Sequence, residues 1–203
     1  LHVPDGQALL GVDGAEMELD EGDILAVEGS GARVGFDGAE GGVSVLRMET
    51  GSELRMTADA NGFSSIEEFR SGAHENDDPD VLSAFDMGEG AILIDVGAIA
   101  GGAAREDVLV DTDEIVGMFD DVEFVGLGDN QDATLTVDYE NDRVTVSLSE
   151  ADSGGTGQVD IVATGAMVTG MEDDEIWNTL TDGQNTYLED NADIPDPGVS
   201  KTP

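Results

Sequence analysis

The amino-acid sequence predicts an all-β protein built of antiparallel β-sandwich or jelly-roll units with one or two short helices. Apolar and polar side chains alternate in residues 133–139, 143–148 and 158–163, which is the period of a strand with one buried face. Because Gly, Asp and Asn separate these segments, we expect them to form an antiparallel meander. Glycine is frequent, at 28 of 203 residues, but follows no fixed period. We therefore expect many turns and neither a collagen-like nor a solenoid fold.

Residues 1–60 are predicted to form a β-rich N-terminal unit. Turn sequences such as Asp20-Glu21-Gly22 and Gly29-Ser30-Gly31 divide it into short segments. The strand candidates are residues 7–11, 15–19, 23–27, 32–36, 43–49 and 53–57. Strands at this spacing are typical of a sandwich or barrel.

Residues 61–90 are predicted to be a linker with a short helix. Ser65-Ile66-Glu67-Glu68 has the pattern of a capping box and precedes Phe69, which predicts one or two helical turns. Residues 71–80 are polar and rich in turn formers, so we expect a surface loop there.

Residues 91–170 are predicted to form a β-sandwich, which opens with a strand at 91–96. Residues 171–203 are predicted to form a short helix and an extended C-terminal tail. The acids that begin at Glu172 favour a helix start, and Trp177 is expected to be a packing anchor. The tail from Asn185 either frays or lies along a neighbouring subunit.

Acidic residues dominate the charge. The chain has 47 Asp plus Glu against 7 Lys plus Arg, a formal net charge of −40 on 21.1 kDa. Small soluble domains usually carry roughly 2 to 8 units. We interpret the excess as adaptation to concentrated salt, where the Debye length falls to about 3 Å at 1 M and self-repulsion is screened. The acids are interleaved with strand-forming residues, which favours a folded chain over a disordered one.

The composition also argues against several classes of partner. The few basic residues are scattered, so we expect no direct contact with nucleic acid or anionic lipid. The apolar runs are far shorter than the ~20 residues that a membrane span needs. Cysteine is absent, which excludes disulfides and thiolate chemistry. Salt cations are the expected small partners.

No catalytic motif is found. His2 and His74 lack partners at metal spacing, and we expect both to be ordinary surface residues. Gly29-Ser30-Gly31 and Gly126-Leu127-Gly128 begin like dinucleotide fingerprints but do not complete them, so we interpret them as turns. With 47 acids, pairs of carboxylates are expected by chance and do not indicate a glycosidase. The prediction is therefore a protein that is not an enzyme, with no catalytic, cofactor-binding or metal residues and no cofactor.

Calcium is the strongest of the ligand hypotheses that acids suggest. Asp111-Thr112-Asp113-Glu114 and Asp129-Asn130-Gln131-Asp132 offer several oxygen ligands in short segments. Neither has the spacing of an EF-hand, so diffuse binding of salt cations is the favoured interpretation.

Two resemblances bear on fold and function. Residues 19–27, 31–36 and 43–48 are similar to the strand rhythm of a cupin, but they contain no histidine, so only a jelly-roll-like topology is implied. Residues 95–104, 121–127, 143–148 and 159–163, with a strand at 108–110, resemble a β-sandwich module of virion proteins of tailed viruses. The module occurs in decoration, fibre and other head or tail surface proteins. The resemblance implies an assembly role without catalytic residues.

Together these observations predict a structural virion protein of a haloarchaeal virus: a capsid, capsid-decoration or turret subunit at the capsid surface. It would form homo-oligomers and contact other virion structural proteins, with Phe119, Phe124, Trp177 and the tail filling cores or subunit contacts. The alternative is a β-sandwich domain of a haloarchaeal cell-surface or secreted protein that binds glycan or a protein partner.

Overall fold

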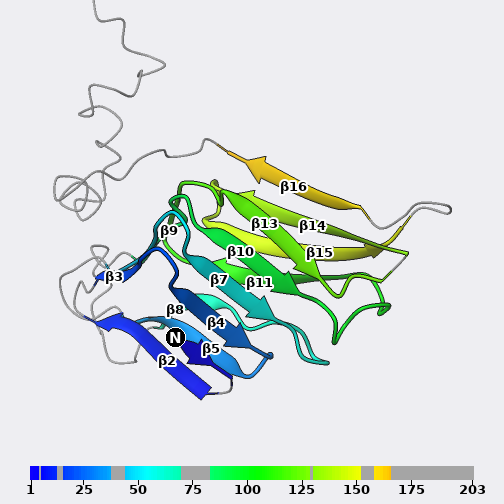
Figure 1. Cartoon of the computed structure of the whole chain (residues 1–203), viewed down its shortest axis with the longest axis horizontal. Coiled ribbons are helices and arrows are strands. Elements are labelled where there is room, and N and C mark those ends of the chain that lie inside the picture. The colour runs from blue at the N-terminus through cyan, green and yellow to red at the C-terminus, as the bar shows by residue number, and fades with distance from the viewer. Residues whose placement is uncertain are drawn as a thin grey trace, which may run out of the picture.

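The computed structural model describes residues 1–4, 6–12, 16–37, 44–69, 83–128, 130–151 and 158–165. Within these residues the chain forms β-strands and no helix (Figure 1). The strands make three sheets, which we call A, B and C.

Sheets A and C are entirely parallel. The strand order of sheet A is β1 (His2–Val3), β4 (Ile24–Glu28), β7 (Glu53–Thr57), β10 (Ala91–Asp95) and β13 (Asp121–Val125). The strand order of sheet C is β12 (Glu114–Val116), β9 (Ser83–Asp86), β6 (Ser44–Met48) and β3 (Glu16–Leu19).

Sheet B is mixed. Its strand order is β16 (Val159–Thr164), β14 (Gln131–Asp138), β15 (Arg143–Glu150), β11 (Arg105–Asp111), β8 (Ile66–Phe69), β5 (Ala32–Asp37) and β2 (Gly6–Val12). The strands from β2 to β11 are parallel to one another, and β15 runs antiparallel to β11 and β14. At the end of the sheet, β16 pairs with β14 in parallel.

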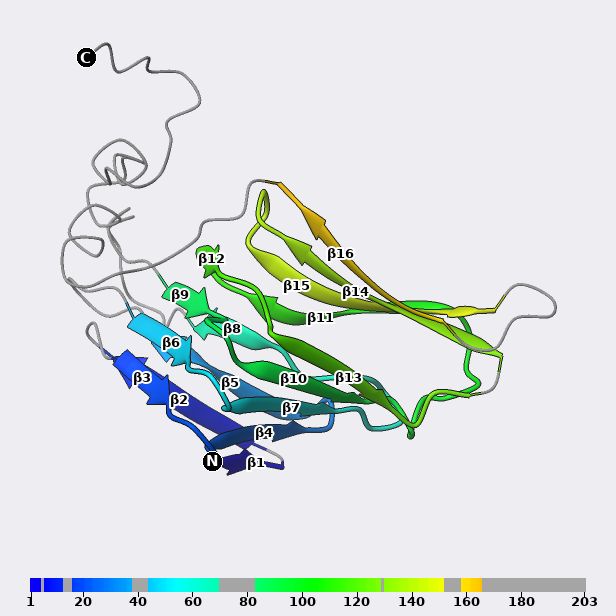
Figure 2. The same ribbon diagram turned by 45° about the horizontal axis from the view of Figure 1, so that its top comes forward.

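The connectivity is that of a parallel β-helix. The chain passes from sheet A to B to C and back to A in each coil, as the strands stacked in Figure 2 show. The predicted antiparallel sandwich or jelly roll is therefore wrong, and so is the exclusion of a solenoid. The period is hidden because the coils differ in length: Ile24 pairs with Glu53, Glu53 with Ala91, and Ala91 with Asp121, which are steps of 29, 38 and 30 residues.

The strand direction was predicted wrongly because alternation of apolar and polar residues shows only that one face of a strand is buried. It does not show whether neighbouring strands are parallel or antiparallel. Strands of ordinary parallel sheets are buried on both faces and read as continuous apolar runs. In this solenoid β7 and β10 are buried on their inner face alone, so they alternate like antiparallel strands. Of the predicted meander, the β14–β15 hairpin is antiparallel as expected, but β16 crosses over to pair with β14.

The positions of the strands were predicted better than their pairing. All six N-terminal candidates are strands in the structure, from β2 to β7. The helix predicted from the capping box at Ser65 is wrong, because Ile66 begins β8 and pairs with Val34 and Val110 in neighbouring coils. The predicted helix after Glu172, the tail from Asn185 and the loop at 71–80 lie outside the described residues.

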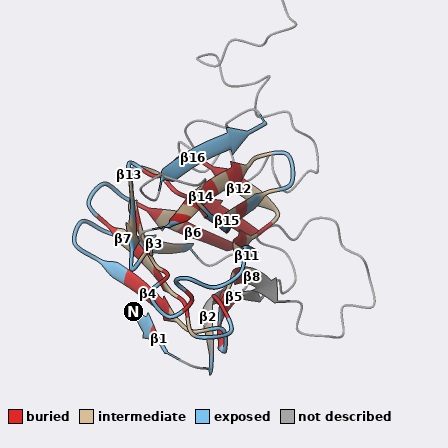
Figure 3. Ribbon diagram, turned by 90° about the vertical axis from the view of Figure 1, so that its right-hand side faces the viewer, coloured by how far each residue is buried: buried red, intermediate tan, exposed pale blue. Residues whose placement is uncertain are grey.

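The core consists of ladders of apolar residues from successive coils. In sheet A the two inner ladders are Leu25, Leu54, Ile92, Val122 and Val27, Met56, Ile94, Phe124. Except for Val122 and Phe124 at the last strand, these residues are at most 1% exposed. Figure 3 shows buried residues along the interior of the coils. One buried cluster extends from Val3 to Leu148, and the division at residues 60, 90 and 170 stays a prediction.

Glycines mark the corner at which each coil returns from sheet C to sheet A. Gly22, Gly51, Gly88 and Gly117 all have positive φ angles there. At Gly88 a side chain is also excluded by space, because a Cβ atom would collide with the carbonyl oxygen of Met48 in the coil below. These corners bring successive coils close enough for lateral hydrogen bonds, such as that from the Gly22 N–H to the Gly51 carbonyl at 2.9 Å.

The outward ladders of sheet A keep acids apart. Because parallel strands stack equivalent positions, an acid in one coil lies beside the matching residue of the next, about 4.8 Å away. The three ladders read Ile24, Glu53, Ala91, Asp121; then Ala26, Arg55, Leu93, Glu123; then Glu28, Thr57, Asp95, Val125. No acid neighbours another acid in any of them. The spacing also accounts for Ile24 and Val125, two exposed apolar residues that lie beside Glu53 and Asp95 respectively.

This spacing is testable at Ala91. Ala91→Glu would place three acids in a row, because position 91 lies between Glu53 and Asp121. We expect a loss of about 1 kcal/mol in the free energy of unfolding relative to Ala91→Gln, which has nearly the same shape without the charge. The measurement is denaturant unfolding at two salt concentrations, and the difference should shrink in the higher salt. Equal stability of the two variants in the lower salt would contradict this account.

Candidate functional site

The described surface offers no unpaired basic patch. Each of the five arginines that the structure describes lies within 4 Å of a carboxylate. The pairs are Arg33–Glu67, Arg47–Glu16, Arg47–Asp86, Arg55–Glu53, Arg105–Asp107 and Arg143–Asp111. In sheet B, where Glu67 and Asp111 are neighbours, each acid has its own arginine. Each described arginine is therefore engaged by a carboxylate, and the described surface has no area suited to phosphate.

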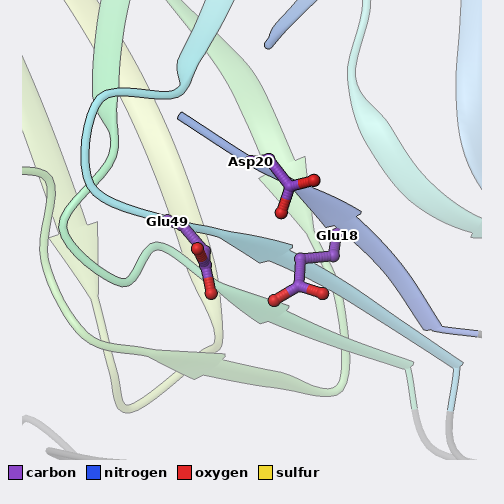
Figure 4. Close-up of side chains that lie close together, drawn as sticks. All are labelled: Glu18, Asp20 and Glu49. Atoms are coloured by element: carbon purple, nitrogen blue, oxygen red, sulfur yellow. The ribbon is translucent and has the colours of Figure 1, made fainter. Parts of the chain in front are cut away.

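One group of carboxylates is close enough to share a cation. Glu18 at the end of β3, Asp20 in the following corner and Glu49 after β6 have carboxylate oxygens within 4.8 Å of one another (Figure 4). All three side chains are exposed. A hydrogen bond and negative charge from Glu18 raise the pKa of Glu49 above its ordinary value. The group concentrates negative charge at a corner, but its exposure suits a hydrated salt cation rather than a built metal centre.

The two segments considered as calcium candidates do not converge. In the first, Asp111 pairs with Arg143, whereas Asp113 accepts a hydrogen bond from the Ser83 N–H at 3.1 Å. In the second, Asp132 accepts the N–H of Gln158 at 2.8 Å, and Asp129 lies outside the described residues. Their carboxylates are therefore used to hold the backbone and one arginine.

The remaining candidates from the sequence are the two histidines and the two glycine-rich segments. His2 in β1 lies 2.9 Å from Glu28 of the next coil, and His74 lies outside the described residues. The glycine segment from Gly29 joins β4 to β5, and that from Gly126 follows β13, so both are turns as predicted.

Two shallow depressions lie beside the corner between β10 and β11, each with a volume of about 460 Å³. One is lined by Gly101, Gly102, Gly128, Asn130, Gln131, Ser149, Glu150 and Ala151. The other is lined by residues 98–105 and Ala60. Their only ionisable side chains are Glu150 and Arg105, and Arg105 is held by Asp107 and the Asn61 carbonyl. The first depression has Ser149 and Glu150 in its lining, but both are exposed and no hydrogen bond joins the hydroxyl to the carboxylate among the described residues; the second has no nucleophile in its lining.

The clearest unexplained surface is the terminal strand β16. Every residue of β16 is exposed, and Val159, Ile161 and Val162 are 43%, 52% and 41% exposed. The parallel register places Val159 beside Ala133 and Ile161 beside Leu135, two fully buried residues of β14. β16 therefore extends the inner apolar face of sheet B beyond the last strand of sheet A. Figures 1 and 3 show it at the margin of the solenoid.

β16 also has a free backbone edge within the described part of the chain. It pairs with β14 on one side only. The carbonyls of Gln158 and Thr164 accept N–H groups from Ala133 and Tyr139, so the even-numbered residues face β14. Because direction alternates along a strand, the N–H and C=O groups of Val159, Ile161 and Ala163 face away from it. Such an edge is a template for pairing with another strand.

Sequence reasoning placed this strand but missed its exposure, because alternation was taken to mean a covered face. A usable signal was present: residues 161–171 contain no Asp, Glu, Lys or Arg, in a chain with 27% charged residues. In so acidic a chain, a long uncharged run indicates a surface that is buried in a contact.

Comparison of the chain with protein families, curated proteins and solved structures finds no match. A search of the described residues for a helix long and apolar enough to span a bilayer also finds none.

A pH effect follows from Glu114 in β12. Burial, followed by the charges of Asp142 and Asp113, raises its pKa from 4.5 to about 7. The folded state then binds more protons than the unfolded state between these values, so stability falls as pH rises from about 4.5 to 7 and levels off above it. We expect Glu114→Gln to stabilise the protein by about 1–2 kcal/mol at pH 8, after allowing for solvent screening, with little gain near pH 4.5.

The matched control is Glu123→Gln, which removes the same charge from an exposed position of β13. Chemical denaturation of both variants across this pH range, in constant high salt, measures the effect. Equal gains for both variants at pH 8 would show that net charge, and not burial of Glu114, sets the effect.

Proposed function

We propose that this protein is a non-enzymatic structural protein that works in concentrated salt by self-assembly and contacts with other proteins. The observation that carries the proposal is the exposed strand β16, which has three exposed apolar residues and one acid, in an otherwise acidic solenoid. Solenoids need a terminal cap with a polar outer face to stay soluble as monomers. An apolar terminal strand instead favours a protein partner.

The acidic surface supports action in brine. A charge of −40 would oppose both folding and association in dilute buffer, because every pair of subunits repels. Screening at molar salt removes most of that penalty. Apolar contacts such as those of Ile161 are then favoured, because many salts strengthen the burial of apolar surface.

The setting that we propose is the virion of a haloarchaeal virus, with this chain as a capsid, decoration or turret subunit. Support comes from the charge and from the terminal strand. The β-sandwich module noted in the sequence no longer contributes, since residues 95–104 and 121–127 belong to a parallel solenoid.

The second candidate is a haloarchaeal cell-surface or secreted protein that binds glycan or a protein partner. The depression lined by Asn130, Ser149 and Glu150 favours this candidate, since these residues supply polar atoms around a volume of about 460 Å³. Glycan arrays probed in high salt would reveal such binding.

Salt dependence tests the proposed environment. Dilution from concentrated NaCl into low-salt buffer is expected to unfold the chain, because unscreened carboxylates repel one another. Far-ultraviolet circular dichroism measures the loss of β-structure. Sucrose at matched osmolality is the control, since it favours compact states without screening charge. An intact β spectrum in salt-free buffer would contradict the prediction.

Self-assembly is tested by sedimentation velocity in concentrated salt over a range of protein concentrations. The full chain is expected to form oligomers, because the exposed apolar residues of β16 gain contact when they lose water. Many symmetric copies of this chain in a purified virus particle would establish the virion setting. A strictly monomeric protein at every concentration would count against the structural role.

A further inference from the structure

We infer that β16 pairs with β16 of a second copy, antiparallel about a two-fold axis through Ile161, and that this is the contact by which the protein assembles. The inference rests on the proposed self-assembly and specifies its interface. The resulting sheet would run without a break from sheet B of one copy into sheet B of the other.

The backbone of β16 fits this register. The free N–H and C=O groups belong to Val159, Ile161 and Ala163, as the hydrogen bonds to β14 require. With the axis at Ile161, that residue exchanges both of its hydrogen bonds with its counterpart. Val159 exchanges its pair with Ala163 of the second copy. The three N–H and three C=O groups that face away from β14 on each copy, twelve groups in all, then form six hydrogen bonds.

The side chains fit the same register. A two-fold axis perpendicular to a sheet keeps each side chain on its original face. Val159, Ile161 and Ala163 would therefore join the Ala133 and Leu135 face of both copies, which is the inner face of the solenoid. Ile161 meets its counterpart directly, so the most exposed apolar residue of β16, at 52%, lies at the centre of the contact.

Charge favours a second copy as the occupant. Asp160 is the only ionisable residue of β16, and in this register it faces Val162 of the partner rather than another Asp160. The strand avoids like-charge contact, as the outward ladders of sheet A do. Residues 166–171, which follow β16, are also uncharged, so the protein's own chain is the competing occupant that the Trp177 measurement below tests.

Single cysteines test the register in the full chain, which has no cysteine of its own. In concentrated salt we expect Ile161→Cys to give a covalent dimer with a one-carbon bis-methanethiosulfonate crosslinker. The two Cα atoms at position 161 would lie about 5.5 Å apart. Val159→Cys is the matched control, on the same strand and face and similarly exposed. Its two copies would be offset by four residues, or roughly 14 Å along the strand, and should not react with each other.

Ile161→Pro tests the hydrogen bonds. It removes an outward N–H and leaves the bonds to β14, so the fold should survive, as circular dichroism would verify. We expect the dimer Kd from sedimentation in high salt to rise at least about tenfold. Trp177, the only tryptophan, reports on the chain after β16. At dilutions where both proteins are monomeric, its emission should be the same in Ile161→Pro and the parent.

The outcomes separate this inference from the proposed function. Association with crosslinking at position 161 alone supports both. Association that survives Ile161→Pro, or crosslinking at position 159 instead, overturns the β16 contact and leaves self-assembly standing. A shift of Trp177 emission in the monomeric variant would show that the protein's own C-terminal segment covers β16, which overturns the contact. Absence of association at any concentration overturns both.

Discussion

The structure depends on lateral stacking of equivalent strands from one coil to the next. Each strand of sheet A hydrogen-bonds in register to the strand of the following coil, so residues at equivalent positions become neighbours. Inside, this stacking converts scattered Val, Ile, Leu and Met residues into continuous apolar ladders, such as that from Leu25 to Ile92. Backbone pairing and core packing are thus the same event, and a chain that has few aromatic residues still buries an extended core.

The same stacking is the main electrostatic problem for so acidic a chain. An in-register sheet would ordinarily bring carboxylates of successive coils within about 5 Å of one another. In sheet A neutral residues intervene, and in sheet C Arg47 lies between Glu18 and Asp86. Acidity is therefore arranged position by position, and the surface can hold many charges without direct acid-to-acid steps in these two sheets.

Sequence reasoning recovered much of the local structure and little of its arrangement. Strand positions followed from alternation, because a side chain's burial depends on its own face. The direction of the strands did not follow from alternation, since the apolar and polar residues of 91–95 alternate in a parallel solenoid as they would in an antiparallel sheet. The corner glycines, such as Gly22 and Gly51, were not seen to recur, because coils of 29, 38 and 30 residues give no constant period. At Ser65 the local helix signal lost to pairing of β8 with two neighbours. The exposure of β16 was detectable only from the uncharged run that begins at Ile161.

The outward ladders also constrain how such a protein can evolve. Solenoids commonly lengthen by tandem duplication of a coil, which places every residue beside its own copy. Here duplication of the coil that begins with β7 would stack Glu53 on Glu53. An acidic solenoid can therefore keep a new coil only if its charged positions diverge from those of the parent coil. Sequence repetition would be erased by this requirement while the backbone repeat is retained.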